Sequence, residues 1–354
     1  MDAGTGKEFK IMNIGLLPQA PMHELLKAIN PKSRWDGNED IRLWQAQARD
    51  TLSALLGLNR IAEYATEPVM QIELDRIDEE MGAREIRFRF VTEERVTVPC
   101  HLVFPLGAVD PLPVVLCLQG HSKAMHISLG RPKYTGDEET CHGGDRDFCA
   151  RAVKEGICAV AIEQRCFGES GGTPNGPDCR QASMRALLLG RTMIGERVWD
   201  IMRCIDVLCT HFTSYIDPDR ILCLGNSGGG TATVYAGALD ERIKISVPSC
   251  AVCTFADSIG AMLHCECNFV PGVAEEFDMG DLCAMTAPRS LIVVSGAEDP
   301  IFPLDGAKQC VEIGRAAYTA YGADDGIHHV IGNSGHRFYA DDSWPIIHAE
   351  IAKL

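Results

Sequence analysis

A series of short apolar runs begins near residue 114, and segments with helical periodicity separate these runs from one another. The runs occupy residues 114–118, 157–162, 221–224, 243–247, 291–294 and 328–331. Apolar runs without polar alternation are typical of strands buried on both faces, and intervening helices make such strands parallel with right-handed crossovers. The sequence therefore predicts an α/β fold with a mostly parallel central sheet and helices on both faces.

Helical spacing of apolar residues predicts the elements that connect these strands. The clearest candidates occupy residues 146–155, 181–189, 196–210 and 344–353. Residues 40–56 also carry apolar side chains at helical spacing, and Gly57 stands where a helix would end. We expect this amphipathic helix to pack on the main body, and a contact within an oligomer is the less favoured interpretation.

Upstream of the apolar runs, the pattern changes to a period of two. Apolar residues alternate with arginines over residues 86–90, a turn follows at residues 92–95, and residues 96–104 have the composition of a partner strand. This pattern predicts an antiparallel N-terminal hairpin that leads into the parallel sheet. Pro99 lacks a backbone N–H and favours an edge position for the second strand.

These patterns predict the domain organisation of the chain. Residues 1–83 are expected to form an arm, extended over residues 1–38, and an amphipathic helix packed on the body. Residues 84–354 are expected to form the main domain, because no linker, internal repeat or low-complexity tract interrupts them.

Charge and composition exclude several classes of partner. A net charge of −16 repels nucleic acids and anionic membranes, and it favours a small neutral or cationic substrate. Residues 1–30 hold no basic region followed by an apolar run, and no later segment is long enough to cross a bilayer. The 16 cysteines are scattered singly, as in a reducing cytosol. We therefore expect a cytoplasmic protein without a disulfide framework, and the sequence leaves a homo-oligomer open.

The run at residues 221–224 leads into Gly225-Asn-Ser-Gly-Gly229, and the small residues that follow can continue as a helix. A serine flanked by glycines at a sharp strand-to-helix turn is the arrangement of a nucleophile elbow. The pattern alone is weak evidence, because glycine-rich turns between strands and helices are common. Ser227 is therefore a candidate nucleophile whose weight depends on an acid and a base elsewhere in the chain.

The ends of later strands supply candidates for the acid and the base. Glu298 and Asp299 follow the run at residues 291–294, and functional groups of open parallel sheets lie just beyond the carboxyl ends of strands. We assign the acid to Asp299, with Glu298 as the alternative, although an Asp-Pro turn also has a purely structural explanation. His336 lies in a glycine-containing turn before the last helix and is the candidate base, a role that needs a carboxylate partner. The remaining histidines are interpreted as structural, and the order Ser227, Asp299, His336 is that of α/β-hydrolases.

An acyl-transfer serine also needs N–H donors directed at the developing oxyanion. The backbone N–H of Gly228, directly after the serine, supplies one donor. The loop after residues 114–118 should supply the second, and we nominate the amide of His121, with Ser122 in reserve.

The motif His264-Cys265-Glu266-Cys267 raises the question of a metal site. Structural zinc sites usually combine two ligand pairs, and no second pair with suitable spacing lies downstream. We therefore expect a packed loop here, and neither a metal nor an organic cofactor.

Several longer phrases resemble a known family. These phrases are Gln164-Arg-Cys-Phe-Gly-Glu-Ser170, Gly190-Arg-Thr-Met-Ile-Gly-Glu-Arg-Val-Trp-Asp200, Ala287-Pro-Arg289, Asp299-Pro-Ile-Phe-Pro303 and Gly335-His-Arg-Phe338. From about Trp44 to the C terminus, the chain resembles the α/β-hydrolase superfamily and, within it, the bacterial group related to acetyl xylan esterases and dienelactone hydrolases. It departs from this group at Gln119, where a histidine is frequent, and at Cys166, where a glycine is usual.

The resemblance implies the α/β-hydrolase fold and a serine carboxylic-ester hydrolase that works through an acyl-enzyme. Its implied substrates are acetylated sugars or other small acyl esters. The alternatives are a peptidase of the prolyl oligopeptidase type and a non-catalytic, hydrolase-fold protein that binds small molecules. The first lacks the repeats of a propeller domain in this sequence, and the ordered triad disfavours the second.

Overall fold

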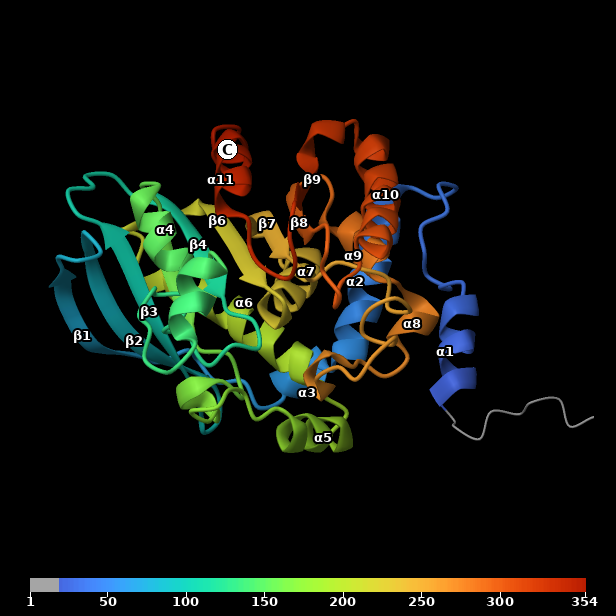
Figure 1. Ribbon diagram of the computed structural model, residues 1–354, viewed down its shortest axis with the longest axis horizontal. Coiled ribbons are helices and arrows are strands. Elements are labelled where there is room, and N and C mark those ends of the chain that lie inside the picture. Colours follow the sequence, from blue (N-terminus) through green and yellow to red (C-terminus); the bar gives the residue numbers. More distant parts are fainter. Residues whose placement is uncertain (1–18) are drawn as a thin grey trace, which may run out of the picture.

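The computed structural model of the protein describes residues 19–354 (Figure 1). Within these residues, the strands form one nine-stranded sheet in the order β1-β2-β3-β5-β4-β6-β7-β8-β9. The strands are β1 (Met70–Asp78), β2 (Ala83–Glu93), β3 (Val96–Pro105), β4 (Leu112–Leu118), β5 (Cys158–Ile162), β6 (Ile216–Asn226), β7 (Ile243–Ser249), β8 (Ser290–Gly296) and β9 (Ile327–Gly332). Strands β4 to β9 pair in parallel, and β1, β2 and β3 add antiparallel ladders, the last of them to β5. The predicted hairpin and the predicted parallel sheet are both confirmed.

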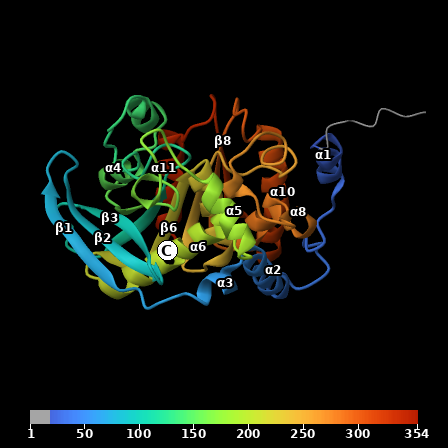
Figure 2. The ribbon, with the colours of Figure 1, turned by 90° about the horizontal axis from the view of Figure 1, so that it is seen from below.

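Helices cover both faces of the sheet (Figures 1 and 2). The helices are α1 (Gln19–Ala28), α2 (Ile41–Leu56), α3 (Leu58–Ala62), α4 (Phe148–Lys154), α5 (Arg180–Leu188), α6 (Met193–His211), α7 (Gly228–Leu239), α8 (Val273–Glu276), α9 (Met279–Thr286), α10 (Leu304–Tyr321) and α11 (Ala340–Ile351). One core contains side chains of α2, α3, α6, α7, α9 and α10, and the other contains side chains of α4 and α11. Across residues 19–354, no helix combines the length and the apolar character that crossing a membrane requires.

Helix α2 confirms the amphipathic helix predicted over residues 40–56. The side chain of Asp40 caps its first turn, and Gly57, with φ 76°, ends it in the left-handed conformation that glycine adopts without steric cost. Its buried face packs in the larger core, and Gln45 donates a 2.7 Å hydrogen bond to the carbonyl of Ala287. The helix therefore belongs to the main body, as expected.

Two expectations about the N-terminal half are wrong. Residues 1–38 are not extended throughout, because Gln19–Ala28 form α1; residues 1–18 lie outside the described part of the chain. Strand β3 is not an edge strand, because it lies between β2 and β5. The carbonyl of Pro99 accepts the N–H of Glu163, just past the end of β5. The carbonyl and the N–H of one residue face the same neighbour in an antiparallel pair, so the missing N–H of Pro99 lies where the pairing of β3 with β5 ends. Proline is therefore tolerated at this position.

Candidate active site

Ser227 lies at a sharp turn between β6, in the middle of the sheet, and α7. Its backbone has φ 57° and ψ −124°, a conformation that non-glycine residues rarely adopt and that costs about 1–3 kcal/mol. A Cβ on Gly225 would lie 2.4 Å from the carbonyl of Gly229, and one on Gly229 would lie 2.1 Å from the carbonyl of Leu118. The two glycines of the Gly-x-Ser-x-Gly pattern are therefore required by close backbone contacts, as the nucleophile-elbow interpretation expects.

Hydrogen bonds to strand β7 hold this strained turn. The N–H of Ser227 donates to the carbonyl of Ser249 at 2.8 Å, and the side-chain amide of Asn226 donates to the hydroxyl of Ser249 at 3.2 Å. The turn is fixed from both sides, because the carbonyl of Ser227 accepts the N–H of Thr231 in the first turn of α7. The Ser227 side chain is thus presented at the carboxyl end of β6 by a rigid support.

Asp299 follows β8, and His336 follows β9, the neighbouring strand. Nδ1 of His336 lies 2.8 Å from Oδ2 of Asp299. The other carboxylate oxygen accepts the backbone N–H groups of Ile301 and Phe302 at 2.8 and 3.2 Å. Glu298 is exposed, so Asp299 is the carboxylate that the fold brings to His336.

The environment of Asp299 keeps its carboxylate ionised. Burial by itself would raise the pKa of this carboxyl, but the hydrogen bond and charge of His336 and the N–H of Ile301 outweigh it, so the pKa is lowered. An ionised partner at Nδ1 fixes the imidazole orientation and stabilises its protonated form. The pair is therefore suited to general acid–base chemistry.

The geometry around His336 is completed by Phe302, whose ring lies nearly parallel to the imidazole with centroids 6.1 Å apart. The backbone carbonyl of His336 accepts the guanidinium of Arg146 at 2.7 Å. Among residues 19–354, no hydrogen bond joins Ser227 Oγ to His336. Such bonds are often loose in substrate-free enzymes and tighten when a substrate binds.

The loop after β4 lies directly against the elbow. A Cβ on Gly120 would lie 2.8 Å from Cβ of Ser227. The N–H of Ser122 is used inside the loop, where it donates to the carbonyl of Gly120 at 2.6 Å. Within the described chain, the amides of His121 and Gly228 donate to no other residue, so both remain available to an oxyanion.

The buried carboxyl group of Glu163 forms a hydrogen bond with this loop. The side-chain amide of Gln119 donates to Oε1 of Glu163 at 2.9 Å, and Gln164 donates to the carbonyl of Gln119 at 2.6 Å. Burial raises the pKa of Glu163 to about 7, against the lowering effect of the Met125 N–H. Gln119 therefore connects the loop after β4 to the segment after β5 through hydrogen bonds.

Two residues near the pair of Asp299 and His336, Cys250 and His264, were not identified as site residues from the sequence. Cys250, with φ 46°, donates to the carbonyl of Arg337, and burial raises the pKa of its thiol to about 12. His264 packs edge-on against Phe302, and burial, with the nearby charges of His121 and His336, lowers its pKa to about 4. The position of His264 within the unusual motif at residues 264–267 was the available signal.

The imidazole of His121 lies against Gly228 and directs its Nε2 towards sulfur atoms. A Cβ on Gly228 would lie 2.5 Å from its Nδ1, and its Nε2 lies 3.1 Å from Sγ of Cys267 and 4.0 Å from Sγ of Cys179. With Cys265, these side chains place one nitrogen and three sulfur atoms within 4.8 Å of one another. One imidazole nitrogen and three sulfur atoms form a donor set that suits a metal ion.

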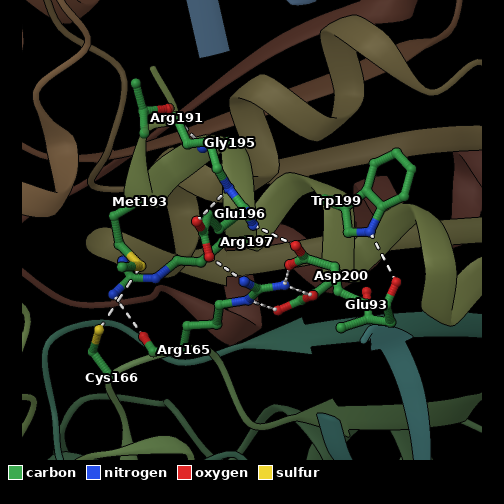
Figure 3. Close-up of polar contacts among 12 residues, drawn as sticks. Glu93, Arg165, Cys166, Arg191, Met193, Gly195, Glu196, Arg197, Trp199 and Asp200 are labelled. Atoms are coloured by element: carbon green, nitrogen blue, oxygen red, sulfur yellow. Dashed lines mark hydrogen bonds and ion pairs between the residues drawn. The ribbon is translucent and has the colours of Figure 1, made fainter. Parts of the chain in front are cut away.

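Two of the phrases that carry the family resemblance meet in a buried charge cluster (Figure 3). Arg165 forms two 2.8 Å hydrogen bonds to Asp200, one of 2.6 Å to Glu93, and one to Glu196. Arg191 also pairs with Glu93, at 2.6 Å. The cluster connects β2, the loop after β5 and the first turns of α6, so it fixes the loop that follows Arg165.

Cys166 explains one departure from the family pattern. Its φ is 73°, a left-handed conformation in which glycine is favoured and other residues are strained. The chain therefore accepts strain at a position where related sequences usually have glycine. The Cys166 thiol is buried against Met193, with 3.8 Å between the sulfur atoms.

A cavity of about 460 Å³ is lined mainly by the segments that follow β4 and β5, and none of Ser227, Asp299 and His336 lines it. Its lining is rich in charge, with side chains that include Arg87, Lys123, Arg131 and Lys133. The candidate active site is therefore defined by the elbow and the paired side chains rather than by this cavity.

The fold is that of an α/β-hydrolase. A sequence model of the Abhydrolase family matches residues 18–329, and the chain belongs to this family.

Individual relatives are more distant. The protein YtaP of Bacillus subtilis (strain 168), which carries the name of a hydrolase, is 27% identical over 245 residues, which is 67% of this chain and 77% of YtaP. A structure from Bacteroides fragilis NCTC 9343 named as an acetyl xylan esterase has a TM-score of 0.73 at 20% identity and covers 93% of this chain and 84% of its own. A glucuronoyl esterase from Solibacter usitatus has a TM-score of 0.66 at 16% identity, with 91% and 97% covered. At these identities, the structural likeness establishes the fold.

Proposed function

We propose that this chain is a serine carboxylic-ester hydrolase that works through an acyl-enzyme intermediate. The observation that carries the proposal is the pairing of His336 with Asp299 at the ends of two neighbouring strands, in a loop that contacts Ser249, the residue that holds the strained Ser227 turn. Acid, base and nucleophile come from separate loops of one sheet edge, which is the triad arrangement of this fold.

In the first half of the reaction, Ser227 Oγ attacks the ester carbonyl carbon while Nε2 of His336 takes the hydroxyl proton. Asp299, bonded to Nδ1, stabilises the imidazolium that forms. The negative charge on the carbonyl oxygen is stabilised by the free amides of His121 and Gly228. The tetrahedral intermediate then expels the alcohol, which receives the proton from His336.

In the second half, His336 takes a proton from water, and the hydroxide attacks the acyl group on Ser227. A second tetrahedral intermediate uses the same two amides, and its collapse returns the proton to Ser227 and releases the carboxylic acid. No cofactor takes part in either half.

The proposed substrates are acetylated sugars or other small acyl esters. Structures with this fold include proteins named as an acetyl xylan esterase, a methylesterase and glucuronoyl esterases, all of which act on esters by name. A net charge of −16 favours a small uncharged ester over a polyanion. None of the 16 cysteines, all of which lie within residues 19–354, forms a disulfide, which supports a reducing compartment such as the cytoplasm.

A series of p-nitrophenyl esters with increasing acyl-chain length tests the substrate class. We expect kcat/KM to be highest for acetate and to fall as the acyl chain grows. Preference for long acyl chains, or hydrolysis of amides at comparable rates, would contradict an acetyl esterase and favour the peptidase alternative.

The Ser227→Ala variant tests the mechanism in the same assay. It should lose turnover by a factor on the order of 10⁶, the loss expected when a triad serine is removed, while its circular dichroism spectrum stays unchanged. Undiminished turnover in a folded Ser227→Ala protein would exclude the serine mechanism.

A further inference from the structure

Three loops that are distant in sequence bring four potential metal ligands together beside the candidate active site. His121 comes from the loop after β4, Cys179 immediately precedes α5, and Cys265 and Cys267 flank the start of a short 3₁₀ turn, Glu266–Asn268. Nε2 of His121 and the three sulfur atoms all lie within 4.8 Å of one another. Cys179 and Cys267 are buried, and His121 and Cys265 are half-buried.

The donor set is that of structural zinc. Three thiolates and one imidazole bind Zn²⁺ in a tetrahedron, with bonds of about 2.3 Å to sulfur and about 2.1 Å to nitrogen. Ligand atoms in such a tetrahedron are separated by roughly 3.5–3.8 Å, by simple geometry from those bond lengths. The 3.1 and 4.0 Å distances from His121 Nε2 to the sulfur atoms of Cys267 and Cys179 span this range. Small side-chain movements therefore suffice to close the tetrahedron.

An independent observation comes from Arg197, which is 1% exposed and whose guanidinium points at the same sulfur atoms. It donates to Sγ of Cys267 at 3.2 Å, to Sγ of Cys179 at 3.4 Å, and to the carbonyl of Arg165 at 3.0 Å. Its guanidinium also lies 4.7 Å from the centroid of the Phe167 ring. Among residues 19–354, no carboxylate forms an ion pair with it.

A buried guanidinium without a counter-charge is costly, so the nearby sulfur atoms must supply the negative charge. Neutral thiols would leave Arg197 uncompensated, whereas a cluster with one net negative charge balances it. Three thiolates that share one Zn²⁺ and a neutral imidazole carry a single negative charge. Arg197 neutralises that charge and donates hydrogen bonds to two of the ligands, as outer-shell groups do in zinc sites.

We propose that His121, Cys179, Cys265 and Cys267 bind one zinc ion. The sequence pattern alone does not indicate this site, because no second ligand pair follows the motif at residues 264–267. The other two ligands lie upstream and 58 residues apart, on loops that only the folded sheet brings together.

The zinc ion would fix the loop after β4, whose His121 carries the proposed second oxyanion donor. This consequence rests on the proposed esterase mechanism. Ligation of Nε2 fixes the imidazole of His121, and the backbone N–H of the same residue is the proposed second oxyanion donor. The ion would hold the loop of His121 against α5 and the 3₁₀ turn at Glu266–Asn268. Its role is structural, because all four coordination positions are taken by protein atoms.

Metal analysis of the full-length protein, purified under reducing conditions with and without added zinc, tests the site directly. We expect about one zinc per chain, and Co²⁺ exchanged into the site should give the visible absorption and thiolate charge-transfer bands of a tetrahedral S₃N complex. Protein that contains no zinc and takes up neither Zn²⁺ nor Co²⁺ would overturn the proposal. A disulfide among Cys179, Cys265 and Cys267 in freshly reduced protein would also overturn it.

Cysteine variants assign the ligands. Cys265→Ser should lower zinc content by about tenfold or more and abolish the Co²⁺ charge-transfer bands, whereas Cys209→Ser, a half-exposed cysteine of α6 outside the cluster, should keep both. If Cys265→Ser does not fold, the chelator-treated wild-type protein supplies the same comparison, since zinc but not Mg²⁺ should restore its thermal midpoint. Full zinc content in a folded Cys265→Ser protein would contradict the assignment.

The Ser227→Ala variant separates the metal site from the proposed function. It should be inactive and still bind about one zinc, because Ser227 is not a ligand. If wild-type protein binds zinc but has no esterase activity, the proposed function fails and the metal site stands. If esterase activity is present in protein that binds no zinc, the metal site fails and the function stands.

Discussion

Nδ1 of His336 lies 2.8 Å from Oδ2 of Asp299, although 37 residues separate them in the sequence. The carboxyl ends of β8 and β9 are adjacent in the sheet, so the loops that follow these strands are brought together. The second oxygen of Asp299 is held by the N–H groups of Ile301 and Phe302. The carboxylate therefore has one oxygen fixed by the backbone and one directed at the imidazole.

This relationship predicts the effect of Asp299→Asn. The amide keeps the shape of the side chain but removes the charge that stabilises the imidazolium and selects the Nδ1–H tautomer. We expect kcat for p-nitrophenyl acetate to fall by a factor on the order of 10⁴, with little change in the thermal midpoint.

Glu298→Gln is the matched control, because Glu298 is adjacent in sequence but exposed. It should keep wild-type kcat. A large loss of kcat in Glu298→Gln, together with near-normal turnover in Asp299→Asn, would show that Glu298 is the acid.

Local patterns in the sequence predict the parallel strands and the elbow because burial dictates both. A strand such as β5 is apolar at every position, since helices cover both faces of the sheet there. The glycines on either side of Ser227 follow from close backbone contacts that any chain with this turn must make. These constraints fix residue types at neighbouring positions, even where the contact partner is distant, as Leu118 is from Gly229, so a single sequence can display them.

Elements that bury little surface, or bury small residues, were not predicted. Strand β1 is exposed along most of its length and is joined to β2 by ion pairs such as Asp75 with Arg84, at 2.6 Å, so the alternation of Met70, Ile72 and Leu74 with polar residues marks no buried face. Helix α10 was also not assigned, because its buried face includes Gly306, Ala307 and Gly314 in place of large apolar side chains. Burial leaves only a weak pattern in such segments.

Relationships between distant loops also cannot be obtained from spacing alone. The left-handed backbone at Cys166 explains why related sequences usually have glycine there, whereas the sequence alone shows only that this chain has cysteine instead. The contact between His121 and Cys267 spans 146 residues, and no rule about ligand spacing predicts it. Which loops meet at one edge of a sheet depends on strand order, and strand order is a property of the whole chain.

The buried carboxyl of Glu163 predicts a pH dependence of stability. Its pKa is raised by burial from 4.5 to about 7 in the folded state. Between these pH values, the folded state binds more protons than the unfolded state, so its stability falls as the pH rises. The contribution of this one group is at most about 1.4 kcal/mol per pH unit.

Urea unfolding of the wild-type protein and of Glu163→Gln at several pH values between 4.5 and 8 measures this contribution. The amide keeps an acceptor oxygen for Gln119 but does not ionise. The free energy of unfolding of the variant, relative to wild type, should therefore rise with pH up to about 7 and then level off. A difference that stays constant across the pH range would contradict the raised pKa.

The charge cluster around Arg165 predicts a large and specific loss of stability. Arg165 is the cation shared by Glu93, Glu196 and Asp200, and Arg165→Met would leave these buried carboxylates with Arg191 as the remaining cation of the cluster. Removing one partner of a buried charge group costs about 3–5 kcal/mol, because the remaining charges stay desolvated.

Arg60→Met is the matched control, since Arg60 pairs with Glu63 at 3.2 Å on the surface and the variant should lose no more than about 0.5 kcal/mol of stability. Urea unfolding at pH 7 measures both losses, and losses of equal size would show that the cluster contributes no more to stability than an exposed pair.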